Sequence, residues 1–335
     1  MNLINNTIFL KFVFVINCLV CLFLFLFYVL NNFYLDILSY YSLVSILYPH
    51  FFILNLFFLI YWVLKFDNRL ILSLIFLFIS LSKPIYLFNS SSNSSDDKLS
   101  QIMGYNVRLF NHYNWIKSDS VPLKISNFIK FTSPEILCLQ EYHNRYVDLF
   151  KDYSDFHLGL NGENVGLAIF SKEKMINKGN VKNSEGKLLS IYVDLKIKND
   201  TIRVYNTHLQ SYNLDLVSLK ADKKSIKEIF FKSKNVYKIQ NVQSELILDH
   251  IKKSKFPSIL SVDLNNTPYS FVYKKFEKIY DDSFVKNGNG FGSTFGSKFF
   301  PMRIDYLFNS SSITSKKFTV YDVSFSDHKP ISMFF

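Results

Sequence analysis

The segment Ser326-Asp327-His328-Lys329-Pro330 lies close to the carboxyl terminus and is hard to explain as a chance surface loop. Arg303-Ile304-Asp305 comes shortly before it in the chain. A buried carboxylate bonded to an imidazole fixes the tautomer of the ring and raises its basicity. We therefore expect Asp305 to orient His328, and Asp327 to point another way, toward a metal ion.

Four further polar clusters precede this pair, and most of them follow apolar, strand-like runs. They are Met103-Gly-Tyr-Asn106, Leu139-Gln-Glu141, Asn206-Thr-His208 and Asp263-Leu-Asn265. Oxygen atoms of Glu and Asn can bind Mg²⁺, and a protonated histidine can stabilise charge on a phosphoryl group. Taken singly, most of these residues could be ordinary turn or strand-end residues. Their joint occurrence, in this order, predicts one metal-dependent phosphodiesterase site.

Residues 101–335 resemble the endonuclease/exonuclease/phosphatase family. The matching motifs are Tyr105-Asn106, Gln140-Glu141, Asn206-Thr207-His208-Leu209, Val262-Asp263-Leu264-Asn265, Ile304-Asp305-Tyr306 and Ser326-Asp327-His328-Lys329-Pro330. The resemblance implies an α/β fold, a four-layer DNase I-like sandwich with two mixed sheets face to face and the site at their shared edge. Val262 replaces a glycine of the family motif, which puts a tight turn or close packing in doubt.

The resemblance also implies hydrolysis of a P–O bond by in-line attack of water, assisted by Mg²⁺ or Mn²⁺. The site residues carried over are His208, Asp263, Asn265, Asp305 and His328 for catalysis, Asn106 and Asn206 for positioning the phosphate, and Glu141, Asn106 and Asp327 for the metal. Asp263 and Asn265 would position water and phosphate, and the histidines would bind or protonate phosphoryl oxygens.

Three apolar segments, 8–30, 43–64 and 70–88, fill the first part of the chain. Each is close to the ~20 residues that span a bilayer as a helix, so we expect three transmembrane helices in 1–88, with two spans as the alternative. Lys65 and Arg69 lie in the second loop and the first loop has no basic residue, which places the amino terminus inside and later residues outside. Residues 89–100 are expected to be a flexible linker to the domain 101–335.

The spans also resemble those of a bacterial subgroup of the family with amino-terminal helices. We therefore expect a multi-pass protein of the bacterial inner membrane, with its catalytic domain on the non-cytoplasmic side. The three cysteines argue against a disulfide framework or a cysteine zinc site.

Residues 100–335 hold 33 of the 38 Lys and Arg residues and 23 of the 27 acidic ones. A basic domain suits a polyanionic partner, although a general abundance of lysine explains it equally well. The expected partners are a phosphodiester or phosphomonoester substrate, with nucleic acid among the candidates, and a lipid bilayer; no obligate protein partner is inferred. A nuclease or phosphodiesterase is favoured. A phospholipid or sugar-phosphate hydrolase and a non-catalytic binding protein are the alternatives.

Overall fold

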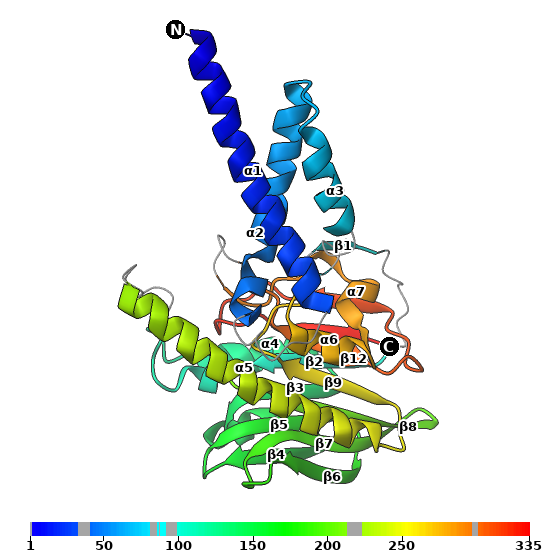
Figure 1. The fold of residues 1–335 in the computed structure, drawn as a ribbon. Helices are drawn as coiled ribbons and strands as arrows, with labels where there is room; N and C mark the ends of the chain where they lie inside the picture. The colour runs from blue at the N-terminus through cyan, green and yellow to red at the C-terminus, as the bar shows by residue number, and fades with distance from the viewer. Residues whose placement is uncertain are drawn as a thin grey trace. The chain divides into compact units, whose positions relative to one another are not determined.

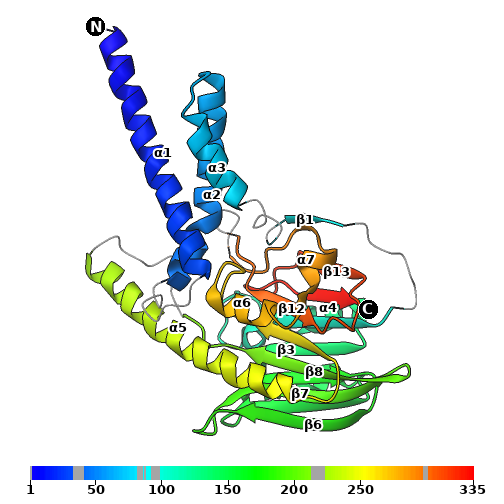
Figure 2. The same ribbon diagram turned by 45° about the vertical axis from the view of Figure 1, so that its right-hand side comes forward.

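A computed structural model describes residues 2–32, 41–80, 86, 88–91, 99–212, 223–296 and 301–335 (Figures 1 and 2). The chain divides into two compact units. The first comprises residues 1–85, 221–237 and 269–271, and the second comprises residues 86–220, 238–268 and 272–335. Each unit is described by itself below.

The first unit contains α1 (Asn2–Asn32), α2 (Tyr41–Leu64) and α3 (Leu70–Ser80), which pack against one another. Two stretches, Thr7–Val29 and Ser45–Leu64, are long and apolar enough to cross a membrane. Only 28% and 17% of these two stretches are buried. Such exposure is unusual for the core helix of a soluble protein and suits a lipid environment.

A polar cluster ties the three helices together. Asn17 on α1 accepts a hydrogen bond from the indole Nε1 of Trp62 on α2 at 2.9 Å and donates one to Ser73 Oγ on α3 at 2.9 Å. Asn55 on α2 accepts from the Asn17 amide at 3.3 Å. These side chains are buried, so their polar atoms favour one helix register over others.

The third expected span is not confirmed. Within the described residues its helix, α3, is 11 residues long, too short to cross a bilayer. Residues 81–85 and 87 lie outside the described part, but Phe88 already belongs to strand β1 (Phe88–Ser90), which pairs with β11 (Asn289–Phe291). The end of the expected span is therefore a strand of the second unit.

The segment 89–100, expected to be a flexible linker, is hydrogen-bonded to the second unit at both of its ends. The Asn89 amide donates hydrogen bonds to the carbonyls of Phe284 and Val285, both at 2.9 Å, because the β1 pairing holds it against that part of the chain. Ser100 exchanges two backbone hydrogen bonds with Phe335, at 3.0 Å each. Residues 92–98 lie outside the described part.

The second unit is built on two six-stranded mixed sheets, which confirms the predicted α/β class. Sheet I has the order β10 (Asp281–Asp282), β12 (Asp305–Asn309), β9 (Ser258–Asp263), β8 (Asp200–His208), β7 (Leu188–Ile197) and β6 (Met175–Lys182). Sheet II has the order β13 (Lys317–Val320), β14 (Ile331–Phe334), β2 (Gln101–Asn106), β3 (Ile136–His143), β5 (Val165–Ser171) and β4 (Asp155–Asn161).

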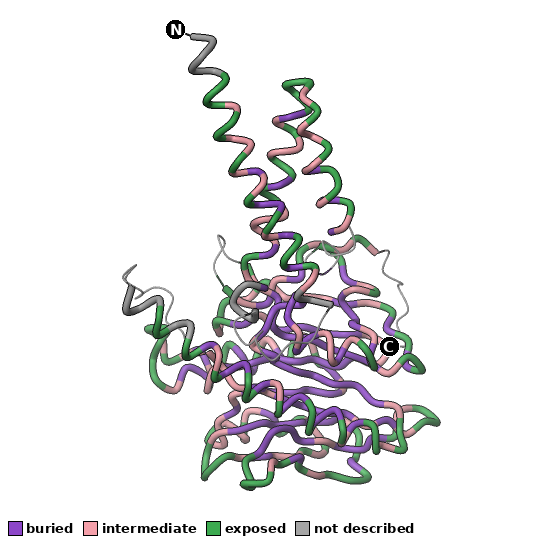
Figure 3. Tube along the Cα trace, in the orientation of Figure 1, coloured by how far each residue is buried: buried purple, intermediate pink, exposed green. Residues whose placement is uncertain are grey.

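The two sheets face each other across one apolar core. That core takes Ile191, Val204 and Ile259 from sheet I and Ile102 and Ile136 from sheet II. Every residue of β2 and β9 is buried, because both faces of these central strands are covered. In Figure 3 the buried trace accordingly runs along the strands.

Helices cover the outer faces of the sheets. The 3-10 helix η3 (Arg108–Asn111), α4 (Val121–Thr132) and η4 (Asn144–Phe150) pack on sheet II. α5 (Lys223–Lys252) contacts sheet I through His250 and Tyr205, and α6 (Phe271–Glu277) through Phe276 and Phe308. The short helix α7 (Ser283–Asn287) follows β10.

Candidate active site

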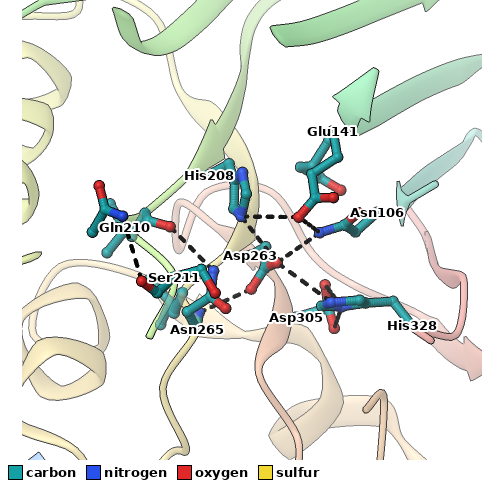
Figure 4. Close-up of polar contacts among 12 residues, drawn as sticks. Asn106, Glu141, His208, Gln210, Ser211, Asp263, Asn265, Asp305 and His328 are labelled. Atoms are coloured by element: carbon teal, nitrogen blue, oxygen red, sulfur yellow. Dashed lines mark hydrogen bonds and ion pairs between the residues drawn. The ribbon is translucent and has the colours of Figure 1, made fainter. Parts of the chain in front are cut away.

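Three of the expected residues lie in one row across the end of sheet I. His208 ends β8, Asp263 ends β9 and Asp305 begins β12. Strand pairing sets His208 opposite Asp263, and Asp263 opposite Asp305. Paired residues on neighbouring strands point to the same face, so register alone brings these side chains together (Figure 4).

Asp305 and His328 form the expected dyad. Nδ1 of His328 lies 2.9 Å from Oδ2 and 3.1 Å from Oδ1 of Asp305. Nε2 of the same ring lies 3.8 Å from Oδ2 of Asp263. Burial opposes the charged imidazolium, but the carboxylates of Asp305 and Asp263 outweigh it and raise the pKa of His328 to about 10. The ring is therefore charged at neutral pH.

Asp263 is the buried centre of the site. Burial and the neighbouring Asp305 carboxylate raise its pKa to about 6, against the opposing effects of His328, His208 and the Asn106 amide. Asn106 Nδ2 donates to Asp263 Oδ2 at 3.0 Å, and His208 Nε2 lies 3.5 Å from the same oxygen. A carboxyl that loses its proton near pH 6 can accept a proton from water at neutral pH.

Sheet II supplies the other side of the site. Asn106 ends β2, and its amide lies 3.3 Å from Oε1 of Glu141 on β3. The β3–β5 pairing shifts register between Leu139 and Tyr142, and Glu141 takes a left-handed φ of 46°. This β-bulge breaks the regular alternation at Glu141. Glu141 Oε1 lies 3.8 Å from His208 Nε2, so the two sheets meet here.

Asn265 takes its place through a turn after β9. Its φ is 51°, a left-handed conformation that asparagine tolerates better than most residues. Its backbone N–H donates to Asp263 Oδ1 at 2.9 Å, and its side-chain amide donates to the Leu209 carbonyl at 3.1 Å. Val262, in place of the motif glycine, pairs regularly with Tyr306, so the strand needs no tight turn there.

Two of the expected site residues, Asp327 and Asn206, are bonded to other parts of the chain and do not contact Asp263. Asp327 Oδ2 forms an ion pair with Arg108 Nη1 at 3.2 Å. Asn206 is fully buried, and its amide donates to the Leu139 and Ala168 carbonyls at 2.8 and 2.9 Å. Its oxygen accepts from Gln140 Nε2 at 2.7 Å. Asn206 therefore links the two sheets, and the structure does not place it among the side chains that converge on Asp263.

A family model described as the Endonuclease/Exonuclease/phosphatase family matches residues 103–328. The chain belongs to this family. Its members are hydrolases that act on phosphoesters. A second model, described as a domain of unknown function (DUF8431), matches residues 10–85. No curated protein sequence is similar enough to this chain to count as a match.

Several solved structures of the endonuclease/exonuclease/phosphatase type share the fold. A family protein from Bacteroides vulgatus is 14% identical, with a TM-score of 0.56 over 71% of this chain and 98% of that chain. A mannosyl-6-phosphatase from Bacteroides thetaiotaomicron VPI-5482 is 19% identical, with a TM-score of 0.51 over 70% and 98%. The human nocturnin catalytic domain with bound sulfate is 18% identical, with a TM-score of 0.51 over 70% and 92%. At these identities the likeness concerns the fold alone.

The donor set of this family member fits a hard divalent cation. Asp263, Asp305 and His328 bring ligand atoms within 4.8 Å of one another, and Glu141 adds a partly exposed carboxylate from sheet II. Nε2 of His208 is buried and has no hydrogen-bond partner within the described residues. Carboxylates this close together repel one another, and a hard cation bound by their oxygens would relieve that repulsion. Among these carboxylates Glu141 is the best candidate for a metal ligand, because Asp305 is already bonded to His328 and Asp327 to Arg108.

Two supporting residues were not predicted from the sequence. The Thr294 hydroxyl accepts hydrogen bonds from the backbone N–H groups of Ile304 and Asp305, both at 3.1 Å, and so fixes the start of β12. Arg108 donates its backbone N–H to Asn106 Oδ1 at 3.0 Å. Threonine in a loop carries no sequence signal for such a role. Arg108 has such a signal, because it is a basic residue only two positions after Asn106 of the Tyr-Asn motif.

Proposed function

We propose that this protein is a membrane-anchored phosphoesterase that hydrolyses a P–O bond by in-line attack of water, with Mg²⁺ or Mn²⁺ as cofactor. The observation that carries the proposal is the convergence of Asp263 from sheet I, Glu141 from sheet II and His328 from the loop before β14. A divalent metal held by Glu141, with Asn106 beside it, would withdraw charge from the phosphoryl oxygens, whereas Asp327 is engaged by Arg108.

The protein's own side chains would activate the water and bind the phosphoryl group. Asp263, with its pKa of about 6, takes a proton from the attacking water, and Asn265 holds that water and the phosphate. His328 is charged and donates to a phosphoryl oxygen, while Asp305 holds its ring. His208 presents Nε2 to the same region. Activity should fall as the pH drops below about 6, because Asp263 then keeps its proton.

A nuclease or phosphodiesterase is the favoured activity, since the basic composition of the domain suits a polyanion. One observation favours a phospholipid instead. Helix α5 exposes an apolar stripe of Phe231, Ile239, Val242 and Leu246 beside Lys238. An apolar stripe with lysine beside it can lie on anionic headgroups.

The deciding experiment uses the full chain in detergent with Mg²⁺ or Mn²⁺. It compares DNA, RNA and dinucleotides with phospholipid vesicles and sugar phosphates. Turnover of a nucleotide ester that chelator abolishes and added metal restores is the expected result. Turnover of phospholipid alone would make the lipid alternative correct, and turnover in chelator would exclude the metal mechanism.

A further inference from the structure

A shallow surface recess, with room for about one water molecule, lies beside the proposed catalytic centre. Its walls include Arg108, Trp115, Phe325 and Asp327. We call it the Trp115 recess. The mechanism proposed above uses neither Arg108 nor Trp115.

The Trp115 recess is tied directly to the catalytic residues. The Arg108 backbone N–H bonds to Asn106 Oδ1 at 3.0 Å, and the Ser326 hydroxyl donates to the Asn106 carbonyl at 2.9 Å. Asp327, in its wall, immediately precedes His328. A substrate whose phosphate reached Asn106 and His328 would therefore extend along this recess.

An unusual backbone segment builds the recess. Arg108, Leu109, Phe110 and Asn111 all have left-handed φ values, from 43° to 62°. For residues other than glycine this conformation costs roughly 1–2 kcal/mol each. Asn111 stabilises it by donating to the Ile116 carbonyl at 2.7 Å and accepting from the Ile116 N–H at 2.8 Å. Such strain persists where the surrounding structure holds it, and it is concentrated at functional sites.

This segment presents two exposed aromatic rings, Tyr113 and Trp115, that meet edge to face at an angle of 71°. The guanidinium of Arg108 stacks over the Trp115 ring, with Cζ 4.4 Å from the ring centroid. Trp115 is 43% exposed, and Tyr113, whose ring is 5.3 Å away, is 66% exposed. Asp327 neutralises the Arg108 charge, so the pair is a weaker anion site than a free arginine. A planar ligand can therefore contact only the exposed part of the indole that Arg108 does not cover.

We propose that a nucleobase of the substrate stacks on the exposed ring of Trp115 at the mouth of the recess, next to the scissile phosphate. This inference rests on the proposed phosphoesterase function and narrows its substrate class to nucleotides with an unpaired base. Exposed tryptophan and tyrosine rings beside arginine are the surfaces on which proteins stack unpaired bases. A sugar phosphate has no planar ring to fill the same surface.

Binding can be tested without turnover, because the chain has two tryptophans and Trp62 is fully buried. Adenosine monophosphate and ribose 5-phosphate carry the same phosphate and differ in the base. In the full chain in detergent, adenosine monophosphate should quench tryptophan fluorescence and ribose 5-phosphate should not. The quench should be absent in Trp115→Phe, whose signal comes from Trp62 alone. An equal quench by both ligands, or a quench that persists in Trp115→Phe, overturns the proposal.

Turnover supplies the second test, with a dinucleotide and its analogue lacking the base on one sugar. Trp115→Ala should lower kcat/KM for the dinucleotide about tenfold through KM and leave the abasic analogue unchanged. Trp115→Phe should restore most of the loss, because the phenyl ring can still stack. Phe156→Ala, which removes a similarly exposed ring on β4 (45%), is the control and should have no effect.

The outcomes separate the two proposals. Base-dependent quenching without any phosphoesterase activity would leave the nucleobase site standing and overturn the proposed function. Turnover in which Trp115→Ala lowers both substrates equally would mean that Trp115 only supports the fold, and a loss specific to sugar phosphates would assign the recess to a sugar. Either result would exclude the nucleobase site.

Discussion

Nδ1 of His328 lies 2.9 Å from Oδ2 of Asp305, while Nε2 of the same ring faces Asp263 at 3.8 Å. The imidazole is thus held on one side by a carboxylate and faces a second carboxylate on the other. Replacing His328 removes the positive charge between them, and replacing Asp305 leaves the ring in place without its anchor. The two substitutions should therefore differ in effect.

His328→Ala should lower kcat by about 10³-fold or more, because the phosphoryl oxygens lose their charged donor. Asp305→Asn keeps the shape and loses the charge, so its loss should be smaller. Rates at saturating metal check this order. His157→Ala, which removes a histidine on β4, is the control. A His328→Ala variant that keeps most of the parent's activity would refute the site.

The raised pKa of His328 also predicts a pH-dependent stability. A folded pKa of about 10 against an ordinary 6.5 means that the folded state holds a proton that the unfolded state releases. The stabilisation is therefore complete below pH 6.5 and is lost as the pH rises through about 10, at no more than about 1.4 kcal/mol per pH unit. Urea unfolding in chelator should show parent and His328→Gln converging as the pH rises. A constant difference would contradict the assignment.

Glu141→Ala should raise the Mg²⁺ concentration needed for half-maximal activity before it lowers the maximal rate, because it removes a metal ligand. A metal titration of the rate measures this directly. Glu163→Gln, an exposed change in the turn between β4 and β5, serves as the control. Unchanged metal dependence in Glu141→Ala would move the metal site to other residues.

Asn206→Ala should destabilise the fold rather than change the chemistry. It deletes three buried hydrogen bonds between the sheets, each worth about 1 kcal/mol, and leaves the Gln140 amide and two carbonyls short of a partner. We expect the free energy of unfolding to fall by about 3 kcal/mol. Activity per folded molecule should stay close to that of the parent. A selective loss of activity at unchanged stability would instead support the phosphate-positioning role.

A reporter fused after Phe335 tests the orientation inferred from Lys65 and Arg69. If the catalytic domain is outside the cytoplasm, a reporter that works only after export should be active. A reporter active only in the cytoplasm should stay silent. The reverse pattern would overturn the orientation. It would also fit an even number of spans, consistent with the short α3.

The α/β fold and the row His208–Asp263–Asp305 could be predicted from the sequence. His208 and Asp263 close strand-like runs and Asp305 opens one, so neighbouring strands can bring all three to a common edge of the sheet. The Asp305–His328 contact followed from residue chemistry. These features depend on local pattern, which a single sequence contains.

Other features depend on tertiary contacts that no local pattern records. Asn206 shares a face of β8 with His208, but it lies two residues further inside the strand. Its side chain therefore bonds to the facing sheet and does not reach the edge where the site lies. Phe88 looked like the end of a membrane span, yet a partner strand far along the chain makes it part of a sheet. The left-handed turn at Arg108–Asn111 contains no glycine, so the sequence gives no sign of its positive φ values.

The division of the site between the sheets has a consequence for the newly made chain. Asn106 and Glu141 are synthesised first, and His208, Asp263, Asp305 and His328 follow later. A nascent chain that ends before Asp263 lacks the buried centre of the site, and strands β13 and β14 of sheet II are made last of all. The proposed site therefore assembles only when synthesis is nearly complete, so a partly made chain cannot carry out the proposed reaction.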